Sequence, residues 1–84
     1  MTEREVTGFI VRATTEPEEP GAVFYEPAFR IRKIGEQYEH PHVSYAVSQN
    51  VVSRSQEEAL QMAEDELSEI TDVIWNGEIW DTRS

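Results

Sequence analysis

Residues 55–70 read SQEEALQMAEDELSEI and contain the clearest local structural signal in the chain. Ser55 and Glu58 form a capping box, in which the serine hydroxyl accepts from the amide of Glu58 and the glutamate reaches back to the cap. Apolar side chains then recur at spacings of three and four residues, at Leu60, Ala63, Leu67, Ile70 and Ile74. This pattern predicts an amphipathic helix that starts at the cap and buries one apolar stripe.

The end of this helix has two interpretations. In the first, the stripe continues to Trp75, and Asn76-Gly77 forms a left-handed C-cap. In the second, the helix stops near Ile70 and residues 73–80 form a hairpin on a two-residue Asn-Gly turn, the favoured sequence for such turns. We favour the first, because the β-branched residues weaken the helix only modestly. In both, residues 78–82 return as a short final strand.

Three β-rich segments precede the helix. Residues 6–14 predict a strand that breaks into the acidic, proline-containing loop 15–21, and residues 22–34 predict a second strand. Residues 42–52 predict a third. In the second strand, a period of two puts Val23, Tyr25, Phe29 and Ile31 on one face and Arg30 and Arg32 on the other.

The order of these elements predicts an α+β fold. It consists of a three-stranded antiparallel meander followed by one helix packed on a sheet face, with a short C-terminal strand (β-β-β-α-β). The length of 84 residues predicts a single small α+β domain spanning residues 1–84.

Composition restricts the compartment and the chemistry. The chain has no cysteine, which excludes disulfides, cysteine zinc sites and cysteine nucleophiles. No segment approaches the roughly 20 apolar residues that span a bilayer, and the charged start of the chain lacks the pattern of a signal peptide. We therefore expect a cytoplasmic protein that has no membrane contact.

The formal net charge of -10 is concentrated after the helix cap. Residues 1–54 hold 8 acidic and 6 basic residues, whereas residues 55–84 hold 9 acidic residues and 1 basic residue. On the predicted helix, an acidic stripe lies opposite the apolar one and contains Glu58, Asp65, Glu69 and Asp72. Such a stripe is either a solvated face or a docking surface for a basic partner, for instance a DNA-binding protein whose groove normally holds phosphates. The same charge disfavours direct binding of nucleic acid.

The basic residues form a weaker candidate site. Arg30 and Arg32, with Arg12 expected on the neighbouring strand, are a candidate anion contact on the open face of the sheet. The more ordinary interpretation is that these side chains pair with surface carboxylates such as Glu26 and Glu36.

His40 and His42 are the candidate metal ligands, also a weak signal. Separated by one residue on an extended chain, their side chains point the same way, and Glu39 or Glu36 would be the third ligand. Exposed histidines in a loop before a strand are ordinary as well. No phosphate loop, nucleophile motif or paired carboxylates accompany them, so we expect neither an enzyme nor a cofactor.

These patterns favour a small acidic, non-enzymatic protein-binding module, an inhibitor or accessory factor of phage or bacterial type. It would dock on a basic partner through the acidic helix, with Trp80 as an aromatic interface anchor. The alternatives are a homo-oligomeric structural domain, such as a homodimer paired through a sheet edge, and a metal-binding protein using His40 and His42. The motifs carry no resemblance to a known family.

Overall fold

The computed structural model describes residues 3–42, 51–75 and 80–83. In chain order these residues form strands β1 (Glu3–Val6), β2 (Phe9–Glu16), β3 (Glu26–Lys33) and β4 (His40–His42), helix α2 (Gln56–Leu67), and strands β5 (Asp72–Trp75) and β6 (Trp80–Arg83). The first four strands form one antiparallel sheet in the order β1-β2-β3-β4, and β5 pairs with β6. The predicted α+β fold, with antiparallel strands before a helix and a C-terminal strand after it, is confirmed.

The first predicted strand is a hairpin. Residues 6–14 were expected to be one strand, but β1 turns into β2 through Thr7 and Gly8, and Val6 pairs with Phe9. Both turn residues have a positive φ, 48° at Thr7 and 92° at Gly8, as a tight type I′ connection requires. Threonine rarely adopts a positive φ, and the sequence Thr7-Gly8 differs from the Asn-Gly or Asp-Gly that usually marks such a turn, so the sequence did not predict it.

The central β2–β3 hairpin agrees with the sequence. All eight residues of β2 pair with β3, from Phe9 opposite Lys33 to Glu16 opposite Glu26, and the acidic loop lies at the tip. Tyr25, Phe29 and Ile31 are buried as the period of two predicts, whereas Val23 lies outside the strand and is 73 % exposed. The expectation for Val23 was wrong because the strand begins later than residue 22.

The third predicted strand, residues 42–52, is shifted. Strand β4 already begins at His40, opposite Ile31, while Val51 and Val52 are not in a strand and residues 43–50 lie outside the described residues. Instead, Tyr25 exchanges two backbone hydrogen bonds with Ser53, at 2.7 and 2.8 Å, just before the helix. This bridge brings the start of α2 to the start of β3.

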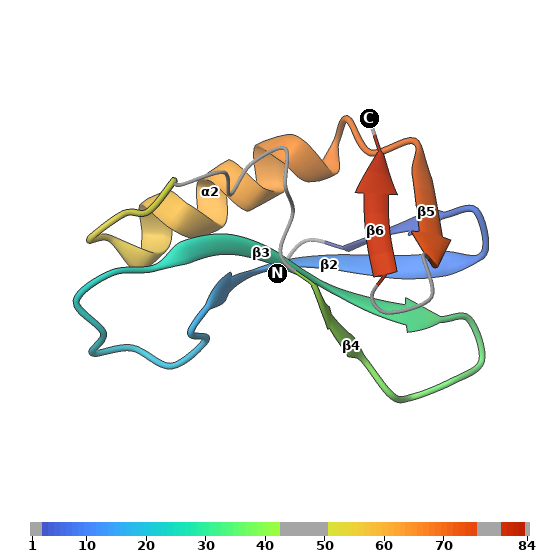
Figure 1. Ribbon diagram of the computed structural model, residues 1–84, viewed down its shortest axis with the longest axis horizontal. Helices are drawn as coiled ribbons and strands as arrows, with labels where there is room; N and C mark the ends of the chain where they lie inside the picture. The colour runs from blue at the N-terminus through green and yellow to red at the C-terminus, as the bar shows by residue number, and fades with distance from the viewer. Residues whose placement is uncertain (1–2, 43–50, 76–79, 84) are drawn as a thin grey trace.

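Helix α2 covers one face of the sheet, packed on β2 and β3 (Figure 1). Its buried residues are Ala59, Ala63 and Leu67, and Leu60 is partly buried. The core between helix and sheet consists of Val6, Val11, Ala13, Phe29 and Ile31 from the sheet with Ala63, Leu67, Ile70 and Val73. Much of the predicted apolar stripe therefore faces the core, although Ile70 reaches it from beyond the helix.

The helix ends at Leu67, earlier than either interpretation predicted. The next turn is tighter, because the amide of Ile70 donates to Leu67 O at 3.3 Å across three residues. A distant side chain completes this end: Nη1 of Arg4 donates to Leu67 O at 2.5 Å and to Ile70 O at 3.0 Å. These two carbonyls are therefore satisfied by β1 and need no glycine cap.

The favoured extension of the helix to Trp75 was wrong, since residues 72–75 form β5. The hairpin interpretation was right in outline and wrong in register. Trp75 pairs with Trp80, whereas a two-residue Asn76-Gly77 turn would have placed Trp75 opposite Glu78. β-branched residues in this segment suit a strand better than a helix.

Candidate functional site

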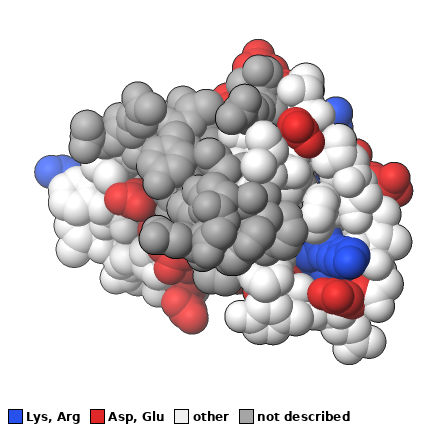
Figure 2. All heavy atoms as spheres, turned by 45° about the vertical axis from the view of Figure 1, so that its right-hand side comes forward, with Lys and Arg blue, Asp and Glu red and all other residues white. Residues whose placement is uncertain are grey.

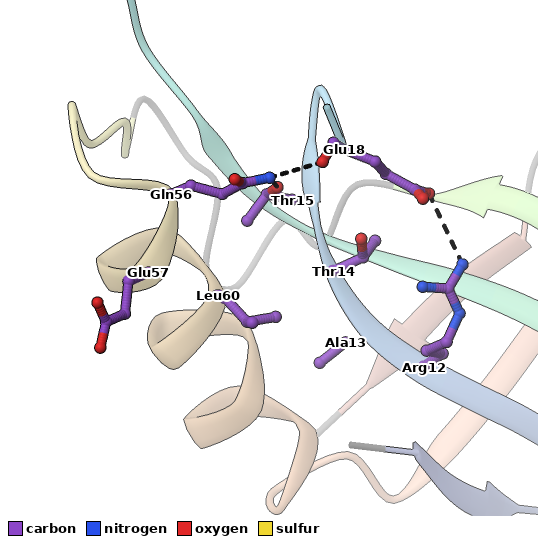
Figure 3. Close-up of a pocket in the computed structure, with 8 residues that line it drawn as sticks. All are labelled: Arg12, Ala13, Thr14, Thr15, Glu18, Gln56, Glu57 and Leu60. Atoms are coloured by element: carbon purple, nitrogen blue, oxygen red, sulfur yellow. Dashed lines mark hydrogen bonds and ion pairs between the residues drawn. The ribbon is translucent and has the colours of Figure 1, made fainter. Parts of the chain in front are cut away.

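A hollow of about 450 Å³ lies beside strand β2 and the start of helix α2 (Figure 3). It is lined by Arg12, Ala13, Thr14, Thr15, Glu18, Gln56, Glu57 and Leu60. Four consecutive residues of β2 belong to this lining and none of β3 does. Because successive side chains of a strand point to opposite faces, the hollow follows the edge of β2. Its volume falls within the range of ligand-sized pockets.

Polar contacts fix the walls of the hollow. Gln56, the first residue of α2, donates through Nε2 to Thr15 Oγ1 at 3.2 Å and to the carbonyl of Glu18 at 2.6 Å (Figure 3). Thr15 Oγ1 donates in turn to the carbonyl of Pro17 at 2.8 Å. These bonds hold the loop after β2 against the helix and so fix the shape of the hollow.

The helix start that borders the hollow has half of the predicted capping box. Ser55 Oγ accepts from the amide of Glu58 at 3.2 Å, as expected. The return bond is different, because the amide of Ser55 donates to Ser53 Oγ at 3.0 Å and not to the glutamate. The carboxylate of Glu58 is thereby left for solvent, and with Glu57 it lies in the first helical turn, where the helix dipole favours negative charge.

Arg12 and Arg30, two of the candidate anion contacts, lie directly opposite each other on β2 and β3. Arg12 makes two 3.0 Å hydrogen bonds to the carboxylate of Glu39. Arg30 donates to Glu18 at 2.6 Å and to Glu16 at 3.4 Å. The bond from Arg12 holds the pKa of Glu39 below its usual value, although burial opposes the shift.

These basic residues are thus paired with carboxylates, which is the more ordinary of the two interpretations, but the expected partners were wrong. Neither Glu26 nor the carboxylate of Glu36 takes part in the described ion pairs. Arg32 instead donates to the backbone carbonyl of Glu36 at 3.3 Å. An anion bound here would have to displace carboxylates that already balance the guanidiniums.

The predicted acidic stripe does not form one helical face, because the helix ends before half of it. Glu58 and Asp65 lie exposed on α2, and Glu69 lies exposed in the turn that follows. Asp72 belongs to β5, where its Oδ1 accepts from the amide of Val73 at 2.8 Å. The stripe is therefore limited to the helix and its last turn.

Helix α2 contains several acidic residues and no basic one. Residues 56–67 contain Glu57, Glu58, Glu64, Asp65 and Glu66 and no lysine, arginine or histidine. Burial, followed by the nearby charge of Glu69, raises the pKa of Glu66. Figure 2 shows acidic side chains at several separate places on one face of the molecule, and a group of basic side chains that lies against an acidic one.

The histidines and the tryptophan can be placed only in part. His40 and His42 lie in β4, opposite Ile31 and Phe29. The ring of His40 makes an edge contact with Tyr38 at 4.7 Å, and no three metal-ligating residues gather anywhere in the described part of the chain. The side chains of His42 and Trp80 lie outside the described residues; the backbone of Trp80 begins β6.

Sequence reasoning missed the hollow. Gln56 and Thr15 are separated by 41 residues, and no local pattern links them. The only available signal was the helix cap at Ser55, which fixes where α2 begins, but the position of that end over β2 depends on tertiary packing.

No family model matches this chain, and no curated protein or solved structure matches it. Among the described residues, no helix is long and apolar enough to cross a membrane.

Proposed function

We propose that this protein is a non-enzymatic binding module that docks on the basic surface of a partner protein through the exposed side of helix α2. The observation that carries the proposal is the separation of charge between the two sides of the fold. The helix has five acidic residues and no basic one, whereas Arg12 and Arg30 on the sheet are matched by carboxylates at close range.

The packing of the helix supports this proposal. Ala59, Ala63 and Leu67 face the core, which leaves Glu58 and Asp65 in solvent. An excess of charge of one sign on a fixed surface steers a partner of opposite charge and raises its association rate. A protein whose surface normally binds phosphates would meet this requirement, so the role we propose is that of an inhibitor or accessory factor. We propose the cytoplasm as its location, since the chain has no cysteine.

The test compares two charge-reversed variants of equal net charge. The first carries Glu58→Lys and Asp65→Lys on the helix. The matched control carries Glu5→Lys and Glu36→Lys, two exposed acidic residues away from α2. Each variant and the unmodified protein are immobilised, exposed to lysate of the source organism at low and high salt, and the retained proteins are identified.

The proposal expects a stoichiometric partner that the unmodified protein and the control both retain at low salt. The helix variant should lose this partner, and high salt should weaken it, because exposed charges are screened within about 8 Å at physiological ionic strength. Equal retention by the helix variant, or equal loss from both variants, would show that the helix face does not determine binding.

A further inference from the structure

The hollow beside β2 contains a buried polar group without a partner. Thr14 lines it and is only 7 % exposed. In the described part of the chain the Thr14 hydroxyl makes no hydrogen bond, whereas the hydroxyl of the neighbouring Thr15 makes two. Figure 3 shows the Thr14 side chain on the same side of the strand as Arg12 and the Glu18 carboxylate, which also line the hollow. A hydroxyl removed from water without a hydrogen bond costs free energy, which a ligand recovers by supplying the bond.

The charges around the hollow leave one carboxylate without a counter-ion. Arg12 makes two hydrogen bonds to Glu39, and the Glu18 carboxylate is likewise bound by a guanidinium of β3. Glu57 lines the hollow from the first turn of α2, and its carboxylate makes no ion pair or hydrogen bond with another described residue. The helix start contributes only a partial positive charge, against Glu57 and Glu58 together. A positively charged ligand is therefore favoured over an anion.

The rest of the lining favours an organic ion over a metal ion. Ala13 and Leu60 add apolar surface, and the volume of about 450 Å³ is that of a site for a small molecule. Within residues 3–42, 51–75 and 80–83, no three metal-ligating side chains gather. An apolar wall does not stabilise a metal ion, whereas the methylene groups of an alkyl ammonium are removed from water there. The hydrogen bonds of Gln56 hold the surrounding loop, so the site is preformed.

We propose that the hollow binds a small organic ammonium ion, whose charged group pairs with Glu57, whose aliphatic chain packs on Leu60, and whose hydroxyl or carbonyl oxygen bonds to Thr14. This site goes beyond the proposed function, because it requires no partner protein. A lysine side chain of a partner offers the ammonium group and the aliphatic chain but no oxygen at the far end. Dependence on Thr14 therefore distinguishes a small molecule from a lysine.

The probes are three compounds with the same five-carbon chain. The first, 5-amino-1-pentanol, has both polar groups; pentylamine lacks the oxygen, and 1,5-pentanediol lacks the charge. Each is titrated at low salt and constant pH into the isotopically labelled protein, and binding is followed by backbone amide NMR.

Three variants accompany the probes. Thr14→Val replaces the hydroxyl by a methyl group, and because the hydroxyl has no described partner, this variant should keep or raise the Tm. Glu57→Gln removes the charge. Glu58→Gln is the matched control, since Glu58 lies in the same turn of α2 but outside the lining.

The proposal expects saturable shifts for aminopentanol, concentrated at residues 12–15 and 56–60, and weaker binding of pentanediol. The preference for aminopentanol over pentylamine should fall about fivefold in Thr14→Val, the factor that corresponds to one hydrogen bond. Glu57→Gln should weaken both amines about three- to fivefold, and Glu58→Gln less than about twofold.

Several results would overturn the proposal. An unchanged preference in Thr14→Val, with binding still dependent on Glu57, would make the hollow an acceptor for a lysine side chain. A lowered Tm of Thr14→Val would show that the hydroxyl is already bonded within the protein. Equal weakening by Glu57→Gln and Glu58→Gln, or the absence of saturable shifts, would leave only general charge attraction. The variants that test docking change Glu58 and Asp65, which are outside the lining, so the two proposals fail separately.

Discussion

The contact between Arg4 and the end of helix α2 can be tested by replacing the arginine with methionine, which keeps an unbranched apolar stem. Arg4→Met removes two hydrogen bonds to the carbonyls of Leu67 and Ile70, at 2.5 and 3.0 Å. A hydrogen bond from a charged group contributes about 1.5–3 kcal/mol when buried. Arg4 is exposed, so we take about 1 kcal/mol for each bond after discounting for solvent. The expected loss is about 2 kcal/mol, or a Tm lower by about 8–16 °C.

The assay is urea unfolding followed by far-UV circular dichroism, with thermal unfolding as a second measurement. Arg32→Met is the matched control, because among the described residues Arg32 donates only to the carbonyl of Glu36, four residues away, at 3.3 Å. This control should cost less than about 0.5 kcal/mol. If Arg4→Met were no more destabilising than Arg32→Met, Arg4 would not stabilise the helix end, and the explanation given above for the early stop at Leu67 would be wrong.

Three further predictions concern the core, the cap and one carboxylate. Phe29→Ala should lower the free energy of unfolding by about 3–5 kcal/mol, because the ring is fully buried. Phe24 is half-exposed, so Phe24→Ala should lower it by no more than about 1 kcal/mol. Chemical denaturation of both variants measures the difference. Ser55→Ala removes the acceptor for the Glu58 amide and should lower the unfolding free energy by about 1 kcal/mol, and an unchanged urea midpoint would contradict this. For Glu66, burial raises the pKa above the ordinary value of 4.5, so the folded protein holds this proton more tightly than the unfolded chain, and the ionised carboxylate destabilises the fold above the raised pKa. Glu66→Gln should therefore raise the Tm near neutral pH and leave it unchanged well below 4.5, and a Tm lowered at neutral pH would contradict the sign.

Local signals predicted those parts of the fold that depend on local interactions. Ser55 marks the start of α2 because the cap bond to Glu58 spans only three residues. The alternation of Phe29 and Ile31 with Arg30 predicted which face of β3 is buried, since that pattern follows from strand geometry.

The remaining parts depend on partners far away in the sequence. The helix ends where Arg4, 63 residues before Leu67, supplies hydrogen bonds to its carbonyls. The hollow requires Gln56 to meet the loop after β2, and the ion pairs of Arg12 require β4 to place Glu39 across the sheet. The turn at Thr7 could not be predicted for a different reason: threonine rarely adopts the positive φ that it has there.

Helix α2 is fastened to the sheet mainly at its two ends. Two of its three buried residues are alanines, Ala59 and Ala63, which remove little apolar surface from water. Hydrogen bonds join Gln56 in the first turn to the loop after β2, and Arg4 of β1 to the last turn. Such an element can detach as a unit at a free-energy cost below that of global unfolding. Its amides should then exchange with deuterated water before those of the β2–β3 hairpin. A partner docked on the helix would suppress this local opening, so exchange rates along α2 would measure binding even where no side chain changes its contacts.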